Sequence, residues 1–475
     1  MAVSDEVRQV EHEIDDCVRA LPLWRCAQER VVRAALEHYR DGIEMLMVAY
    51  SAALIERDHG AADVPLLIEG RLRAGVLHVV KWALTRCPEQ AAEHLDAGMI
   101  DSAQDLGAHY EAWVDSLKLA EHDLAQIEVD QEARRITVYE GGEVTGADWA
   151  LVDHQQRTNP LRAHVSLTED GDQLTAAWTA GDYRRTTAWL RAIAIDAQRE
   201  TVVFAPPGVA PIDLFPRPVV LVIPNPPEPA MRPVLEDLTL TTARLSGLGF
   251  WRYFSWLDTP LVSVGGERQA VSDTLIALGG MTRDDHMLRL AALVERTQYE
   301  RVSGAREGRM IAMCRQILEP LGWTVTPRRR LTDPPGDLDV YALRGCEQLA
   351  AQLKSTLRPE APWEVYKRND DVRHGIEQAD RARAQLGENV TAVVITDGYR
   401  GDYATWQVAL ERRVPIGTLD DVEAIARDPA QAFALLQRRV GFGAESHGEA
   451  PQERTCDLMG WSVRIVDARP QSTPP

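Results

Sequence analysis

The chain has 475 residues, enough for about two to four domains, and its 45% hydrophobic and 26% charged residues are typical of a globular protein. Its net charge of −20 excludes a protein that coats nucleic acid over its whole surface. It contains no run of about eighteen apolar residues, no apolar leader and no CxxC cysteine pair, so we expect a cytoplasmic protein without a membrane span, a disulfide framework or a zinc site.

Residues 1–125 predict a bundle of helices that begins with Ser4 as an N-cap. Apolar residues recur at helical spacing after Ser4, and a second such run extends from about Leu23 to Glu56. Residues 1–150 hold 29 Asp and Glu against 14 Lys and Arg. These acidic faces are ordinary solvated surface, a surface that docks a protein partner or a second copy, or a mimic of nucleic acid.

Residues 126–300 predict a mixed α+β region to which the sequence assigns no function. The expected elements are two strands at 127–130 and 135–139, a helix from Tyr183 to Ala197 and a buried strand from Val219 to Ile223. Prolines surround the last strand and mark a boundary or a rigid connection. The aromatic cluster at 250–256 includes Arg252; such clusters can stack on bases, but they more often belong to a core or an interface.

Residues 301–442 predict a mixed α/β domain, because the order of elements is helix, strand, strand, strand, helix, strand, helix. The expected elements are a helix at 304–318, strands at 321–325, 336–343 and 349–355, a helix at 371–386, a central strand at 390–396 and a short strand at 414–417 between two helices. Residues 443–475 are expected to be a polar tail with one strand at most, between Met459 and Val466.

The hairpin at 336–355 carries the residues with the clearest chemistry. Strand side chains alternate between faces, so Asp337 and Asp339 are expected to share one face of the first strand, and Gln352 and Lys354 one face of the second. These groups are expected to converge at one end of a small sheet. Carboxylate and amide oxygens are suitable ligands for a hard cation such as Mg²⁺. Such a cation polarises a phosphate and activates a water, while a lysine stabilises the charge that develops. Each of these residues alone is an ordinary turn or surface residue, but the set indicates phosphodiester cleavage.

This pattern resembles the PD-(D/E)XK nuclease superfamily, and within it the Mrr-like restriction endonucleases, in which Gln replaces the second acid. The resemblance covers roughly residues 300–430. It implies that Asp339 is the metal-binding aspartate, with Asp337 as a second candidate, that Gln352 fills the second-acid position and that Lys354 is the lysine. Glu307, on the preceding helix, matches the glutamate that the family carries there.

The resemblance implies a Mg²⁺- or Mn²⁺-dependent DNA endonuclease of prokaryotic restriction or phage defence. In the mechanism that we expect, Asp339, Gln352 and the Leu353 carbonyl hold the ion while a water attacks in line. Lys354 then orients this water, and Glu307 binds the ion or acts through a second water. His374 is a further candidate helper, although a lone histidine at the start of a helix is more often a surface residue.

The alternative is a catalytically silent nuclease fold that binds nucleic acid or acts as a scaffold for a partner protein. A metal-dependent cleavage product separates the two hypotheses.

Positive charge collects around the expected site. Residues 301–375 hold 13 Lys and Arg against 10 Asp and Glu, in a chain that is acidic as a whole. A local groove for DNA has this composition, and a solvated face is the alternative. The expected DNA contacts are Arg328, Arg329, Arg330, Arg358, Lys367 and Arg368.

The sequence thus predicts a multidomain α+β protein in four parts. They are a helical bundle at 1–125, a mixed region at 126–300, a restriction-endonuclease-like domain at 301–442 and a polar tail at 443–475.

Overall fold

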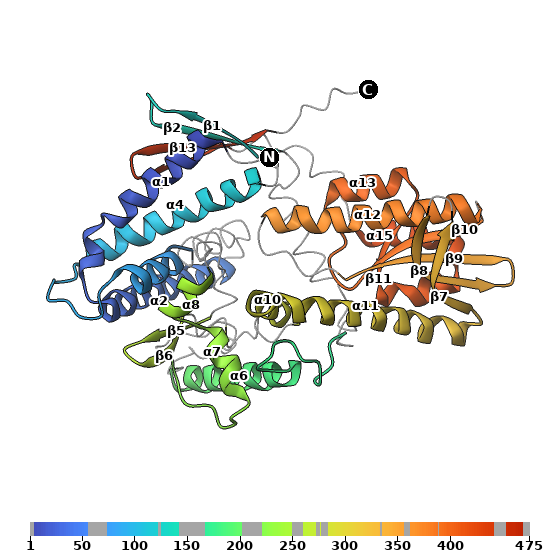
Figure 1. Ribbon diagram of the computed structural model, residues 1–475, viewed down its shortest axis with the longest axis horizontal. Helices are drawn as coiled ribbons and strands as arrows, with labels where there is room; N and C mark the ends of the chain where they lie inside the picture. Colours follow the sequence, from blue (N-terminus) through green and yellow to red (C-terminus); the bar gives the residue numbers. More distant parts are fainter. Residues whose placement is uncertain are drawn as a thin grey trace.

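The structure, a computed structural model, contains both helices and sheets, and the described strands form three sheets (Figure 1). The described residues are 4–55, 74–121, 125–141, 167–201, 221–248, 260–271, 276, 284–332, 335–355, 362–387, 389–440 and 453–468. None of the helices in these ranges is long and apolar enough to cross a membrane. The boundaries of the four expected parts stay predictions, and contacts cross them: the Thr242 hydroxyl donates to the Leu84 carbonyl at 2.7 Å.

The N-terminal part is helical, as the apolar periodicity predicts. Its elements are α1 (Asp5–Arg19), η1 (Pro22–Arg25), α2 (Gln28–Ile55), a helical segment at 74–86 and α4 (Ala97–Glu121). Ser4 is the N-cap of α1, because its hydroxyl accepts a 3.3 Å hydrogen bond from the Val7 amide. The apolar sides of these helices pack into one core that includes Val10, Leu36 and Trp113.

A sheet joins the two ends of the chain. Its strands are β1 (Ala125–Asp130), β2 (Arg135–Gly141), β12 (Glu453–Leu458) and β13 (Trp461–Ala468), in the order β1-β2-β13-β12. The expected strands at 127–130 and 135–139 are confirmed as β1 and β2, which pair antiparallel. β13 runs parallel to β2 and lies beside it above α1 and α4 in Figure 1.

The C-terminal segment therefore differs from the expected polar tail with one strand at most, because it forms two strands. Trp461, Val463 and Ile465 are buried in the N-terminal core, whereas Ser462 and Arg464 between them are exposed. This alternation is that of a half-buried strand, but it is short and lies in a polar context, which hides it in the sequence.

The middle part combines short strands with helices. Its elements are α6 (Ala180–Thr201), β3 (Val222–Ile223), α7 (Met231–Leu238), β4 (Thr239–Leu240), α8 (Thr242–Leu248), β5 (Leu261–Val264), β6 (Glu267–Ala270) and α10 (Asp284–Val294). The strands form a sheet in the order β3-β6-β5-β4. The expected helix at 183–197 is confirmed within α6, whereas the aromatic cluster at 250–256 lies outside the described residues.

The part that carries the candidate site is built on a five-stranded sheet in the order β11-β10-β9-β8-β7. Its elements are α11 (Arg296–Leu318), η6 (Glu319–Leu321), β7 (Thr324–Thr332), β8 (Pro335–Arg344), β9 (Glu347–Lys354), α12 (Pro362–Leu386), β10 (Val390–Thr396), α13 (Tyr403–Glu411), β11 (Ile416–Thr418), η7 (Leu419–Asp421), α14 (Val422–Arg427), η8 (Pro429–Gln431) and α15 (Ala432–Val440). β7, β8 and β9 are antiparallel, and β9, β10 and β11 are parallel.

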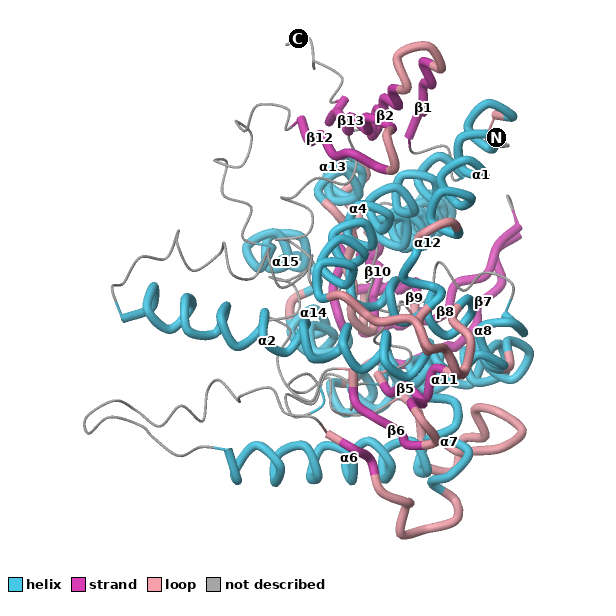
Figure 2. Tube along the Cα trace, turned by 90° about the vertical axis from the view of Figure 1, so that its left-hand side faces the viewer, coloured by secondary structure: helices cyan, strands magenta, loops and turns pink. Residues whose placement is uncertain are grey.

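Helices cover both faces of this sheet. Figure 1 shows α12 on one side and α11 on the other, and Figure 2 gives the same molecule turned by a quarter turn. On the α12 side, Ala392 and Val394 pack with Val372 and Ile376. On the α11 side, Ala351, Leu353, Val393 and Ile395 pack with Met310 and Cys314. Residues of β9 and β10 thus alternate between two apolar layers, as period-two strands require.

The ladder between β7 and β8 is interrupted at one point. Pro327 pairs with Val340 and Arg329 pairs with Leu338, so Arg328 and Asp339 face each other between two regular pairs. Leu338 packs in a different apolar cluster from Val340, although strict alternation would place both on one face. Alternation therefore does not hold all along β8, and the expected shared face of Asp337 and Asp339 stays a prediction.

Candidate active site

Asp339 is a buried carboxylate held by the neighbouring strand. Its side chain lies on β8 and the residue is 6% exposed, while Oδ2 accepts a 2.7 Å hydrogen bond from the Leu353 amide. The pKa of Asp339 is raised to about 6, mainly by burial and also by the Glu307 charge, while the Leu353 bond and the charges of Lys354 and Arg328 oppose this rise. A carboxyl group in this state is a strong candidate for a cation site, because a bound cation favours its ionised form.

Gln352 follows Ala351 on β9 and is the neighbour of Asp339 in the strand register. Val340 pairs with Ala351 across β8 and β9, so Asp339 and Gln352 are the next residues along this ladder. Gln352 is 5% exposed, and its Oε1 atom has no hydrogen-bond partner in the described part of the chain. A buried acceptor without a partner costs about 1–3 kcal/mol. The position therefore fits an oxygen that binds a cation or a water.

Lys354 lies at the end of β9, on the side covered by α12. Its Nζ atom donates a 2.9 Å hydrogen bond to Gln378 Oε1 of α12. Gly375 makes room for the lysine stem, since a Cβ at that position would lie 3.0 Å from Lys354 Cε and 3.2 Å from its Cγ. Burial lowers the pKa of Lys354, while the charges of Asp339, Asp371 and Glu307 oppose this effect.

Glu307 joins this group from α11. The residue is half-buried, and its charge raises the pKa of both Asp339 and Lys354. Asp339, Gln352, Lys354 and Glu307, all expected at the site from the sequence, therefore lie around one end of the sheet.

The structure connects the other expected residues, Asp337 and His374, less closely to this site. Asp337 is exposed and pairs with Arg330 across β7 and β8, so its assignment as a metal ligand stays a prediction. The His374 side chain is 58% exposed and lies 4.0 Å from Glu377.

The expected DNA contacts are spread over two elements and one undescribed segment. Arg328 and Arg330 are exposed on β7, whereas Arg329 is half-buried, with its guanidinium carbon 4.0 Å from the centre of the Tyr341 ring. Lys367 is exposed on α12, and Arg368 pairs with Asp371 at 3.3 Å. Arg358 lies outside the described residues.

Arg306 is a residue that the sequence reasoning missed. It precedes Glu307 on α11, is 6% exposed, and donates to Asp397 Oδ2 and Thr168 Oγ1, both at 2.8 Å. Asp397 follows β10 and also accepts a 2.7 Å hydrogen bond from Ser355, which follows Lys354. This buried network fixes the ends of β9 and β10 against α11. An acid directly after a buried parallel strand is the sequence signal that points to it.

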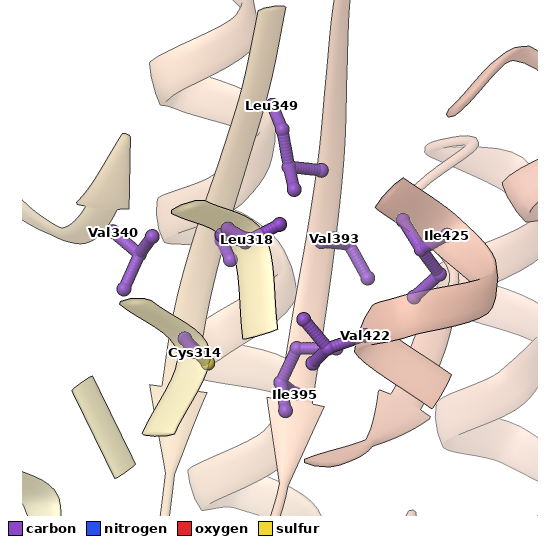
Figure 3. Close-up of a pocket in the computed structure, with 9 residues that line it drawn as sticks. Cys314, Leu318, Val340, Leu349, Val393, Ile395, Val422 and Ile425 are labelled. Carbon is purple, nitrogen blue, oxygen red and sulfur yellow. The ribbon is translucent and has the colours of Figure 1, made fainter. Parts of the chain in front are cut away.

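A small hollow in the same part of the fold does not contribute to the site. Figure 3 shows it between α11, the sheet and α14, with side chains that carry only carbon and sulfur. The labelled residues are Cys314, Leu318, Val340, Leu349, Val393, Ile395, Val422 and Ile425. Burial raises the pKa of the Cys314 thiol to about 12, which makes it unreactive, so the hollow belongs to the core.

The donor atoms fit a hard cation with an incomplete protein shell. Among the described residues, no three Asp, Glu, His or Cys side chains lie close enough together to hold a metal by themselves. One carboxylate, one amide oxygen and a carbonyl leave the remaining positions to water and substrate oxygens, as is usual for Mg²⁺. Asp339, Gln352 and the Leu353 carbonyl are the protein atoms that would hold it.

Comparison with known proteins adds little to this description. No family model and no curated protein sequence matches the chain. Among solved structures, protein VC1899 from Vibrio cholerae matches with 12% identity and a TM-score of 0.20, over 67% of this chain and 60% of that chain, less than two thirds of its length. Can2 from Sulfobacillus thermosulfidooxidans, solved in complex with cyclic tetra-adenylate, matches with 12% identity and a TM-score of 0.19, over 72% of this chain and 74% of that chain. Similarities at this level carry no argument about function.

Proposed function

We propose that the chain is a Mg²⁺-dependent DNA endonuclease that hydrolyses phosphodiester bonds, in the setting of prokaryotic restriction or phage defence that the sequence resemblance implies. One observation carries the proposal: the unpaired Gln352 oxygen is buried next to Asp339, a carboxylate that the Leu353 amide holds in place. Lys354 and Glu307 complete a set of groups suited to phosphodiester cleavage.

Each side chain has a separate task in this proposal. Asp339 and Gln352 would hold the cation, which would polarise the phosphate and activate the attacking water. Lys354, held by Gln378, donates to the attacking water and to the oxygen on which charge develops. Glu307 accepts a proton or holds a second water. The buried Arg306–Asp397 pair keeps the two strand ends in register with α11 and so fixes the distances between these groups.

The test is a cleavage assay on supercoiled plasmid, linear duplex and single-stranded DNA, with Mg²⁺, Mn²⁺ or EDTA. We expect cutting with either metal and none with EDTA. Asp339→Ala and Lys354→Ala should abolish cutting, whereas Lys118→Ala, which removes a half-buried lysine paired with Glu121 on α4, should leave it unchanged. Cutting that persists in EDTA or in Asp339→Ala would refute the proposed site.

A catalytically silent fold that binds nucleic acid or acts as a scaffold is the second candidate function. It is favoured by Gln352, because an amide gives the site one negative charge fewer than a carboxylate. A silent fold would bind DNA equally well with Lys354→Ala and would give no metal-dependent product.

The acidic N-terminal half is proposed as the docking surface for a protein partner or a second copy. Residues 1–150 hold 29 acidic and 14 basic residues. This negative charge supports a surface that does not bind nucleic acid. Light scattering of the purified chain separates the two, because a second copy doubles the mass that one chain of 52.9 kDa gives.

A further inference from the structure

Arg328 has an unusual backbone for its position in a strand. Its φ of 48° lies in the left-handed region, which is disfavoured for every residue with a Cβ atom. Among the described non-glycine residues, Arg134, Arg328, Arg413 and Met459 have a positive φ, and Arg328 is the one placed inside β7. Such strained residues concentrate at functional sites, where the surrounding structure holds them.

The strain occurs directly opposite Asp339. The regular pairs Pro327–Val340 and Arg329–Leu338 flank the two residues. The β7–β8 ladder is therefore irregular only at Arg328 and Asp339. Irregularities of this kind redirect a side chain and are common beside active sites. The left-handed residue and the candidate metal ligand therefore belong to one local feature.

The Arg328 guanidinium is available for a ligand. The residue is exposed, and within the described part of the chain it takes part in no hydrogen bond or ion pair. Its neighbour Arg329 differs, because its guanidinium lies over the Tyr341 ring. The Arg328 charge reaches the site, since it lowers the pKa of Asp339 against the effect of burial.

We propose that Arg328 binds a phosphate of the nucleic-acid strand next to the one that Asp339 and its cation hold. The planar guanidinium presents paired donors that match two phosphate oxygens, which suits this task better than the point charge of a lysine. The chain keeps an unfavourable backbone at residue 328 because this backbone directs the guanidinium along the nucleic-acid strand. This inference rests on the proposed function, and it adds a substrate-binding residue to that site.

The test compares two arginine-to-glycine variants with the same backbone change. Arg328→Gly removes the guanidinium and the strain together. Arg413→Gly is the matched control, because Arg413 is also exposed and has a φ of 50°, in the turn between α13 and β11. Its carbonyl accepts a 3.1 Å hydrogen bond from Arg383, and glycine retains this carbonyl.

Binding of a short DNA duplex is measured with Ca²⁺ in place of Mg²⁺, over a series of salt concentrations, beside the thermal midpoint Tm of each protein. Both variants should raise Tm by about 1–3 °C, because glycine adopts the left-handed backbone without a clash. Arg328→Gly should weaken binding about tenfold and reduce the salt slope by about 0.9, the value for one phosphate contact. Arg413→Gly should bind like the parent, and Arg328→Lys should lie between.

Three results with the variants overturn the inference: Arg328→Gly binds like the parent, Arg413→Gly loses as much affinity as Arg328→Gly, or Arg328→Gly lowers Tm while Arg413→Gly raises it. A parent that binds no duplex also overturns it. A parent that binds duplex but never cuts it refutes only the proposed nuclease activity, since the binding comparison does not depend on cleavage.

Discussion

The Leu353 amide nitrogen lies 2.7 Å from Asp339 Oδ2 and ties β9 to β8 where their regular ladder ends. A backbone donor cannot swing away, so this bond fixes the rotation of the carboxylate. Oδ1 is then the oxygen that a cation would take. Leu353 also carries the carbonyl proposed as a further ligand, so one residue orients the carboxylate with its amide and would supply a second oxygen.

The raised pKa of Asp339 predicts a pH-dependent stability of the metal-free chain. The folded pKa is about 6, and an unfolded aspartate has a pKa of about 3.9. Between these values the folded state binds more protons than the unfolded state. The contribution of Asp339 to stability is therefore full below about pH 4 and is lost as the pH rises through 6. In EDTA, Asp339→Asn should therefore raise Tm relative to the parent at about pH 7.5 and much less at about pH 5.

Two observations would check this prediction. Saturating Mg²⁺ should raise the Tm of the parent more at the higher pH, because the cation competes with a proton, and it should leave Asp339→Asn unchanged. An equal Tm difference between parent and variant at both pH values would show that Asp339 does not titrate in this range.

Gln352→Glu should strengthen cation binding at the expense of the metal-free fold. The carboxylate adds a charge to the ligand set, and we expect Mg²⁺ affinity to rise about tenfold in calorimetric titration. Without metal, two buried carboxylates side by side should lower Tm. Gln352→Leu is the control: it removes the unpaired oxygen, so it should weaken Mg²⁺ binding and leave the metal-free Tm equal or higher. Unchanged affinity in both variants would exclude Gln352 as a ligand.

Gly375→Ala should damage the chemistry more than the fold. The new Cβ would lie 3.0 Å from Lys354 Cε, so the lysine must move by a few tenths of an ångström. We expect cleavage to fall about tenfold with unchanged DNA binding, because small misplacements of a reacting group are costly. Gly304→Ala is the matched control, since a Cβ at that position meets nothing within 4 Å; it should stabilise α11 by about 0.5–1 kcal/mol and keep full activity. Equal activity of the two variants would contradict this role of Gly375.

Asp397→Ala should be strongly destabilising. Asp397 and Arg306 form a 2.8 Å ion pair whose side chains are 5% and 7% exposed, so removing the acid leaves a buried charge without its partner. The expected loss is about 3–5 kcal/mol in chemical denaturation. Glu423→Ala, which breaks an exposed pair with Arg427, should cost less than about 1 kcal/mol. Similar losses for both variants would mean that the buried pair carries no special weight.

The element order of residues 301–442 could be predicted because each element has a strong local pattern. The central strand at 390–396 is confirmed in full as β10, and the hairpin is confirmed as β8 and β9. α12 begins earlier than expected, at Pro362, because proline is well suited to the first turn of a helix and does not only end segments. The shared side of Gln352 and Lys354 also follows from alternation alone.

The rest of the site depends on contacts that no local pattern encodes. The irregular pair at Arg328 and Asp339 is set by two strands together, so the period-two rule alone does not predict it. The role of Arg306 depends on its hydrogen bonds to Thr168, Ser355 and Asp397, which are distant in sequence. The strand pairing of β13 with β2 joins segments from opposite ends of the chain, which no short window of sequence can reveal.

That pairing has a consequence for how the protein is made. β2 is synthesised early, but its neighbour β13 leaves the ribosome after the whole five-stranded sheet. During this interval one edge of β2 has no partner strand, and the buried places of Trp461, Val463 and Ile465 in the N-terminal core are unfilled. Exposed strand edges and apolar surface of this kind are binding sites for chaperones and for other nascent chains. The N-terminal part is therefore the last to be completed, although it is the first to be translated.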